Sequence, residues 1–266
     1  MWCSITLLAA VALAPLQADH LALTNVHATY GVLGPPRPDT KLLPGDELVL
    51  SFDIQGARAT PAGKILYSVG MEVTDRQGKV QFKQLPNNLE VEAPPRGRPL
   101  PACATLQIGL DQEPGKYAIK VSVTDRVAGA TGEFSRTCEI LPRAFGLVRA
   151  RTTSDSEGRQ PIASVRQGQT AWINFAAVGF GHSASGGQPH VSVVMRILDA
   201  TGRPILGKPS QGEIMKDVPA NARALPMQFA LAVNRTGKFT VELTATDQIG
   251  RHTCNLNFPL TVGKAE

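Results

Sequence analysis

This chain contains one sequence pattern twice, and the internal repeat limits its fold more than any other feature. The segment Gly115–Asp125 returns as Gly237–Asp247, with the same Gly-Lys at its start and the same Thr-Asp at its end. Four landmark pairs, matched by local sequence, are separated by 123, 124, 121 and 122 residues: Gly45/Gly168, Met71/Met195, Leu106/Met227 and Gly115/Gly237. A near-constant offset indicates a duplicated folding unit with only small loop changes between the copies.

Both copies show the alternation of apolar and polar residues that is typical of half-buried strands. Along Lys116–Thr124 every second residue is apolar, which gives the strand one dry and one wet face. No long helical period is present. Strands are expected at 21–30, 46–55, 66–75, 78–84, 104–110, 116–125 and 133–141, and again at 145–152, 169–178, 189–199, 203–206, 225–232, 238–247 and 251–262. Short strands at this spacing predict an all-β chain of two tandem immunoglobulin-like Greek-key β-sandwiches after a signal peptide.

Residues 1–18 are apolar, end in small residues and are too few to span a bilayer, which predicts a secretory signal peptide cleaved after Ala18. A buried N-terminal strand or helix is the alternative. The expected domains are residues 19–142 and 143–266, joined by the short link Leu141–Phe145, which favours a fixed or semi-rigid tandem. No other stretch approaches membrane-spanning length, so no transmembrane segment is expected. The predicted location is the periplasm, the cell surface or the extracellular space.

Three cysteines follow the predicted cleavage site: Cys103, Cys138 and Cys254. In an oxidising compartment two of them should pair. Cys103 and Cys138 belong to the same repeat, and a disulfide between them would close a loop of about 35 residues, stabilising the fold by roughly 3–4 kcal/mol. The corresponding residues in the second repeat are expected to be Ala224 and Leu260. Cys254 is interpreted as a small buried apolar residue or, alternatively, as an intermolecular link.

The Gly-Lys-Tyr motif of Gly115–Asp125, followed by a closing strand, resembles the last hairpin of many bacterial immunoglobulin-like and fibronectin-III-like extracellular modules. The segment 19–266 as a whole is similar to exported bacterial two-domain proteins without an assigned function. This resemblance implies the sandwich architecture and says little about activity, because fold alone does not determine function. The antibody pattern of a strand-C tryptophan against an inter-sheet cysteine pair is missing, since Trp172 falls on the expected second strand.

Known catalytic motifs are missing from the sequence, so no enzymatic activity and no cofactor are expected. The segment Phe180–Gly187 combines histidine and serine but is better interpreted as a glycine-rich loop. His182 and His190 flank this loop and suggest, as a less favoured alternative, a periplasmic copper or zinc site or an enzyme. Nothing supplies a third ligand at a diagnostic spacing. Asp125 and Asp247 each end a strand and are interpreted as Asx-turns rather than calcium ligands.

Charge and loop composition identify the candidate binding residues. The net charge of +5 and the pI near 9.2 favour anionic partners, although the basic residues are dispersed. Arg96 and Arg98 lie among prolines in the expected loop 84–101 and either form a basic contact or protect a sheet edge from pairing. Tyr67 and Tyr30 are the candidates for exposed aromatic rings. Basic residues interleaved with aromatics are missing, so no nucleic-acid binding is expected.

These features predict a non-enzymatic exported protein whose two modules act in adhesion, scaffolding or binding. The expected partner is a protein or a cell-envelope component. The alternative function is binding of an envelope polysaccharide or another polyanion through the Arg96 and Arg98 loop.

Overall fold

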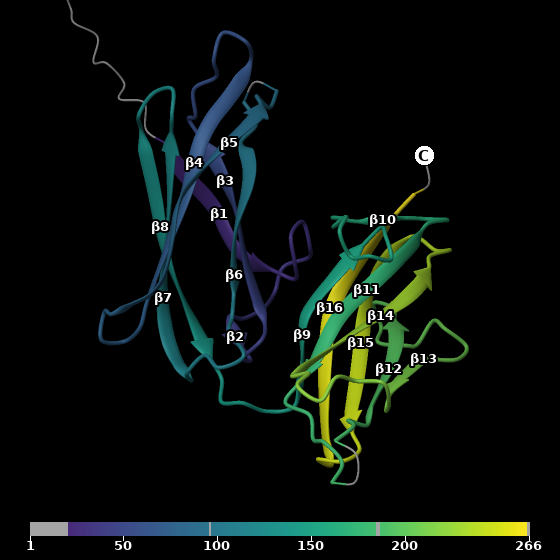
Figure 1. Cartoon of the computed structure of the whole chain (residues 1–266). Coiled ribbons are helices and arrows are strands. Elements are labelled where there is room, and N and C mark those ends of the chain that lie inside the picture. The colour runs from purple at the N-terminus through teal and green to yellow at the C-terminus, as the bar shows by residue number, and fades with distance from the viewer. Residues whose placement is uncertain (1–20, 96, 185–186, 265–266) are drawn as a thin grey trace, which may run out of the picture.

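The computed structural model describes residues 21–95, 97–184 and 187–264 (Figure 1). These residues form sixteen β-strands and no helix. These ranges therefore contain no helix that is long and apolar enough to cross a membrane. The predicted signal peptide, residues 1–18, lies outside the described residues.

The first half of the chain folds into a sandwich of a three-stranded and a five-stranded sheet (Figure 1). The smaller sheet has the order β1-β3-β6, formed by Ala22–Thr29, Glu47–Gln55 and Leu100–Gln107. The larger sheet has the order β2-β8-β7-β4-β5, formed by Lys41–Leu42, Thr131–Ile140, Gly115–Asp125, Lys64–Thr74 and Val80–Glu92. The chain changes sheet between β3 and β4 and again between β5 and β6, as in immunoglobulin-like Greek keys.

The second half repeats this topology strand for strand. Its smaller sheet has the order β14-β11-β9, formed by Ala224–Ala232, Thr170–Val178 and Gly146–Thr153. Its larger sheet has the order β10-β16-β15-β12-β13, formed by Val165–Arg166, His252–Gly263, Gly237–Asp247, Val191–Leu198 and Ser210–Ile214. The predicted fold class is confirmed: the chain forms two tandem immunoglobulin-like β-sandwiches.

The predicted alternation places one apolar core between the sheets of each sandwich. Ile119, Val121 and Val123 of β7 are fully buried, as are Val241 and Leu243 of β15, while the intervening residues are more exposed. Each core is built from leucine, isoleucine, valine and phenylalanine side chains. Burial of this apolar surface is the main favourable contribution to folding.

The strand register corrects one of the landmark pairs. Leu106 pairs with Leu48, whereas Leu231 pairs with Ala171. Because Leu48 and Ala171 occupy equivalent positions, the counterpart of Leu106 is Leu231 and not Met227. By the same register the counterpart of Cys103 is Gln228 and not Ala224. The comparison of short sequence segments aligned this strand wrongly with its counterpart, because no glycine turn marks the start of this strand in the two copies.

The expected loop 84–101 is also corrected. Strand β5 continues to Glu92 and β6 begins at Leu100, so the connection between the two strands is only the short segment 93–99. The strand passes Pro86 through a bulge, because its pairing with β4 shifts register between Gln84 and Asn87. In the second sandwich the expected strand 203–206 is irregular apart from a bridge at Pro204, and the edge strand is β13.

The predicted Cys103–Cys138 disulfide is not formed, because the structure gives both residues as free cysteines, along with Cys254. Strand alternation explains the difference. In β6 the side chains of Leu100, Ala104 and Leu106 enter the core, so Cys103 lies on the opposite face of its sheet. Cys138 of β8 is buried within the core. The two sulfur atoms therefore belong to different sides of the smaller sheet.

Asp125 and Asp247 are fully buried at the ends of β7 and β15. One carboxylate oxygen of Asp125 accepts hydrogen bonds from the backbone N–H groups of Val127, at 2.7 Å, and of Ala128. Its other oxygen accepts from the backbone N–H of Arg58, at 2.7 Å, in the loop between β3 and β4. Asp247 repeats this arrangement in the second sandwich. Each aspartate closes its own Asx-turn, as predicted, and also ties that turn to a distant loop.

Candidate binding surfaces

The two sandwiches contact each other directly beyond their short link. Val148, Ala176 and Val178 lie on the outer face of the smaller sheet of the second sandwich and are buried there. Leu43 and Leu110 of the first sandwich pack against them. This apolar contact lies beside the link and helps to fix the relative position of the two sandwiches.

A buried carboxylate stabilises the same junction. Asp46 accepts a hydrogen bond from the backbone N–H of Arg149, at 2.9 Å, and pairs with the guanidinium of Arg37, also at 2.9 Å. Arg149 in turn donates through Nε to the carbonyl oxygen of Gly45, at 2.7 Å. Because Asp46 is buried with both partners in place, its charge is compensated within the interface.

Tyr30 extends from the first sandwich into the core of the second. It follows β1, and its ring centroid lies 5.5 Å from that of Phe258 on β16. The Tyr30 hydroxyl donates to the carbonyl oxygen of Asn257, at 3.3 Å. Only 7% of Tyr30 is exposed, so this tyrosine is not the exposed aromatic ring that the sequence suggested. It is an anchor between the two sandwiches.

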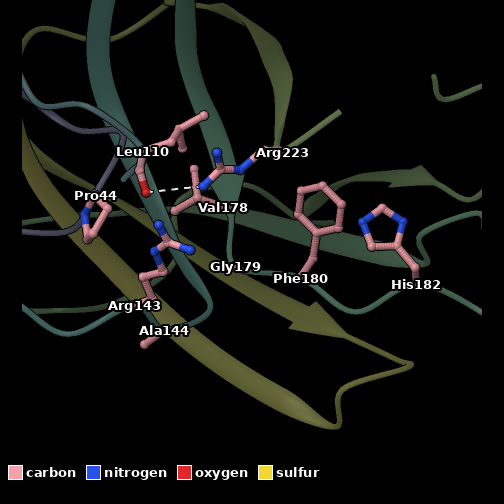
Figure 2. A pocket seen from close by; sticks show the side chains of 9 residues that line it. All are labelled: Pro44, Leu110, Arg143, Ala144, Val178, Gly179, Phe180, His182 and Arg223. Atoms are coloured by element: carbon pink, nitrogen blue, oxygen red, sulfur yellow. Dashed lines mark hydrogen bonds between the residues drawn. The ribbon is translucent and has the colours of Figure 1, made fainter. Parts of the chain in front are cut away.

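A hollow of about 180 Å³ lies at this junction (Figure 2). Arg143 from the link and Arg223, which precedes β14, both border it, and both guanidinium groups pair with the carboxylate of Asp111. The hydrogen bond from Arg223, reinforced by Arg143, lowers the pKa of Asp111 to about 2. Phe180 and His182 line the opposite part of the hollow, with ring centroids 5.2 Å apart.

The size of this hollow limits its role. Pockets for small ligands usually enclose about 300–1,000 Å³. The junction hollow falls below that range, and its two arginines are already paired with Asp111. The arrangement is therefore better suited to holding the two sandwiches together than to enclosing a substrate.

The free edge of the first sandwich is a more extensive surface. Strand β5 has thirteen residues and pairs on one side only, with β4. Phe82 and Leu85 on this strand are 43% and 73% exposed, and Val80 is also exposed. An edge strand with unpaired backbone groups and exposed apolar side chains is a template for pairing with another chain.

Behind Phe82 a groove of about 140 Å³ opens between β5 and β6, and part of its lining is polar: Gln81, Gln107 and Gln112. Leu106, Tyr117, Cys138 and Ile140 line it. In the second sandwich the equivalent place, lined by Leu231, Phe239, Leu260 and Val262, retains only about 30 Å³ and is also bordered by Ile205 and Leu206. The groove is thus open in one copy of the repeat and nearly closed in the other.

The predicted binding residues do not form one site. Arg96 lies outside the described residues, while Arg98 is exposed in the connection between β5 and β6. Tyr67 is only 6% exposed and belongs to the core, which corrects its assignment as a binding residue. It shares the inward face of β4 with Ile65, Val69 and Met71, so strand alternation directs its ring inward.

His182 and His190 have separate partners. Nδ1 of His182 hydrogen bonds the carbonyl oxygen of Gly187, at 2.7 Å, whereas Nε2 of His190 contacts the carboxylate of Glu213 on β13. Within residues 21–95, 97–184 and 187–264, no three His, Cys, Asp or Glu side chains gather in a group that could hold a metal ion. Metal binding by the two histidines stays a prediction.

Sequence reasoning missed Phe82, Leu85 and the arginines of the junction. The signal for Phe82 and Leu85 was available, since both are large apolar residues in a segment rich in polar ones and interrupted by Pro86. Arg149 carried no comparable signal, because its position is defined by contacts between the two sandwiches.

Comparisons with known proteins leave the function open. No family model and no curated protein matches the chain. Among solved structures, the C-terminal domain of the Streptococcus agalactiae AgI/II polypeptide BspA is 8% identical, with a TM-score of 0.30 over 91% of this chain and 99% of that chain. The C-terminal domain of the Streptococcus pyogenes antigen I/II-family protein AspA gives 9% identity and a TM-score of 0.30 over 91% of this chain and 98% of that one.

A third solved structure is Escherichia coli alpha-2-macroglobulin activated by porcine elastase, at 10% identity and a TM-score of 0.31, covering 94% of this chain and 22% of that chain. Similarity at this level establishes neither a common fold nor a common function. Any functional argument must therefore start from the residues of this chain.

Proposed function

We propose that this chain is a non-enzymatic exported binding protein whose first sandwich presents the edge strand β5 to a protein partner. The observation that carries the proposal is the exposure of Phe82 and Leu85 on a long strand that pairs on one side only. Export rests on the signal-peptide pattern of residues 1–18, and the non-enzymatic role rests on the missing catalytic motifs.

The partner expected at β5 is an extended segment that adds a strand to the larger sheet. Its backbone would hydrogen bond the free side of β5, and an apolar side chain would enter the groove behind Phe82. The equivalent groove of the second sandwich is nearly closed. The second sandwich therefore acts as a support that fixes the first, and the binding edge belongs to the first alone.

The test is co-sedimentation of residues 19–266 with cell envelopes of the source organism, with a photo-crosslinker at position 82 to identify the attachment point. We expect Phe82→Lys and Leu85→Lys to reduce pelleting severalfold at unchanged thermal stability. Met215→Lys, which changes an exposed apolar residue beside β13, is the matched control and should pellet like the wild type. Equal pelleting of all three variants would contradict the proposal.

The alternative, a polyanion binder that uses Arg96 and Arg98, makes a different prediction in the same assay. Its pelleting would fall steeply with salt, because each released counterion adds to the salt dependence. Arg98→Gln would weaken it, and substitutions in β5 would not. Pelleting that resists salt and requires Phe82 excludes this alternative.

A further inference from the structure

A cavity of about 480 Å³ lies on the outer face of the smaller sheet of the second sandwich, next to the junction, with which it shares Arg149 and Ala176. Its floor includes a row of polar side chains that crosses the sheet: Arg151 on β9, Asn174 on β11 and Gln228 on β14. These residues are direct cross-strand neighbours, since Asn174 pairs with both Arg151 and Gln228. Ile173 and Phe175, on either side of Asn174, belong to the core, so the row faces outward.

The guanidinium of Arg151 has no partner in this structure. Its Nε is buried and makes no hydrogen bond, and Arg151 forms no ion pair within the described residues. Buried donors in proteins are nearly always satisfied, and an exception calls for an explanation. A ligand cannot reach the buried Nε itself, but the two Nη groups of this guanidinium also have no partner among the described residues, and a carboxylate in the cavity would bind them in the two-pronged geometry that Arg favours.

The position of Arg151 is set by both sandwiches. A Cβ placed on Gly31 of the first sandwich would lie 2.8 Å from Cβ of Arg151, so the loop after β1 presses on the base of this side chain. At its other end, Nη2 of Arg151 would lie 3.2 Å from a Cβ on Gly158, in the loop that follows β9. Arg151 therefore lies close to backbone near both ends of its side chain, which restricts the space open to it.

The remaining lining groups favour a ligand with one negative charge and several hydroxyls. Asn174 donates to Thr153 through Nδ2, at 2.9 Å, and keeps its amide oxygen as a possible acceptor. Ser156 and Glu157 border the cavity, and the Glu157 carboxylate pairs with Arg159, at 3.3 Å. Apolar surface comes from Ala176 and Pro226, and the volume lies within the usual range for small ligands.

We propose that this cavity binds an acidic sugar, a uronic acid unit within an oligosaccharide. The carboxylate pairs with Arg151, and the ring hydroxyls bond Asn174, Gln228 and Ser156. The apolar face of the ring lies on Pro226. An oligo-aspartate peptide fits less well, because it has no hydroxyl groups for Asn174, Gln228 and Ser156. This site is independent of the protein-binding edge at β5, and either one can fail without the other.

The internal repeat provides a comparison within the same chain. The register that aligns the two copies places His27, Ser51 and Cys103 of the first sandwich where Arg151, Asn174 and Gln228 stand in the second. The first sandwich thus has no arginine and no amide in this row. The proposed sugar site belongs to the second sandwich only.

The test is calorimetric titration of residues 19–266 with oligogalacturonate, with a neutral hexose oligomer of the same length, with an oligo-aspartate peptide and with inorganic sulfate. We expect measurable affinity for oligogalacturonate only. Arg151→Gln should lower that affinity about tenfold or more, because it removes a charge-assisted pair. Arg151→Lys should retain part of it, since it keeps the charge and loses the two-pronged geometry. Arg76→Gln makes the same change in net charge at an exposed turn of the first sandwich and should stay within about twofold of the wild type.

Each contrary result overturns the proposal. An equal loss in Arg151→Gln and Arg76→Gln would mean diffuse electrostatic attraction. Equal affinity for sulfate would mean a bare anion site, tighter binding of the peptide would mean a peptide site, and equal affinity for the neutral oligomer would remove the role of the carboxylate. Thermal unfolding of each variant separates lost binding from lost folding.

Discussion

Tyr30 belongs to the first sandwich in sequence, but its replacement by alanine should destabilise the second sandwich. The residue follows the first strand of the first sandwich, yet its ring packs within the core cluster of the second, against Phe258. Tyr30→Ala removes a nearly fully buried ring and leaves a cavity in that cluster. Truncation of a buried aromatic residue to alanine costs about 3–5 kcal/mol, and we expect about 3 kcal/mol here.

The control is Tyr30→Phe, which keeps the ring and removes only the hydroxyl that donates to the carbonyl oxygen of Asn257. A single neutral hydrogen bond contributes about 1 kcal/mol, so this variant should be close to the wild type. The difference between the two substitutions isolates the packing of the ring from its hydrogen bond.

Hydrogen exchange under native conditions measures where the loss occurs. A loss of about 3 kcal/mol corresponds to a decrease in protection of roughly 100-fold. We expect this decrease in the amides of β15 and β16 of the Tyr30→Ala variant, while those of β7 and β8 change little. Unchanged protection of β15 and β16, or a loss confined to β7 and β8, would refute the assignment of Tyr30 to the second core.

Three further predictions follow from the buried and paired groups. Asp125→Ala leaves the backbone N–H groups of Arg58, Val127 and Ala128 without their acceptor, and should lower the free energy of unfolding by about 3 kcal/mol or more in urea titrations; a loss below about 1 kcal/mol would contradict the role of this carboxylate. Because Arg223 and Arg143 lower the pKa of Asp111 from 3.8 to about 2, their ion pairs with Asp111 are complete above about pH 3.8 and are lost as the pH falls through 2; an NMR titration of the Asp111 carboxyl carbon should give a midpoint near 2 in the wild type and near 3.8 when both arginines are replaced by glutamine, and a wild-type midpoint near 3.8 would contradict the pairing. Burial raises the pKa of the Cys138 thiol to about 11, so Cys138 in the native protein should react slowly with thiol reagents at pH 8. The unfolded protein should show the thiols of Cys103 and Cys138 without prior reduction. A Cys103–Cys138 bond found by mass spectrometry would contradict the strand alternation described above.

The sequence was most informative where one strand determines its own environment. The alternation of Gly115–Asp125 predicted which side chains enter the core, because a strand places successive residues on opposite faces. The aspartate that ends this strand was likewise recognisable, since its first hydrogen bonds are made to the next residues of the chain. Both inferences need no knowledge of distant neighbours.

Features that depend on distant partners were missed or misread. Pro86 indicated the end of a strand, but a bulge carries β5 past it to Glu92. Cys103 and Cys138 met the requirement of belonging to one repeat, but pairing also requires that both side chains point to the same side of a sheet. The burial of Tyr30 depends on Phe258, which lies more than 200 residues away in sequence.

The Arg151 cavity could not be predicted for the same reason. Its polar row becomes visible only when β9, β11 and β14 are aligned by register. The restriction of its arginine depends on Gly31, which comes from the other sandwich. A dispersed positive charge in the sequence therefore becomes a defined site only in the folded tandem.

The contact between the two sandwiches has a consequence for assembly. Duplicated modules that stack through equivalent surfaces can polymerise end to end, because each added module offers the next one the same surface. Here the register places Ser154 of the second sandwich where the first has Tyr30, and Asp53 of the first where the second has Ala176. The outward surface of the second sandwich thus lacks the tyrosine, and the outward surface of the first lacks the apolar residue that the contact requires. An identical contact to a further module of this kind is therefore not offered by either outward surface.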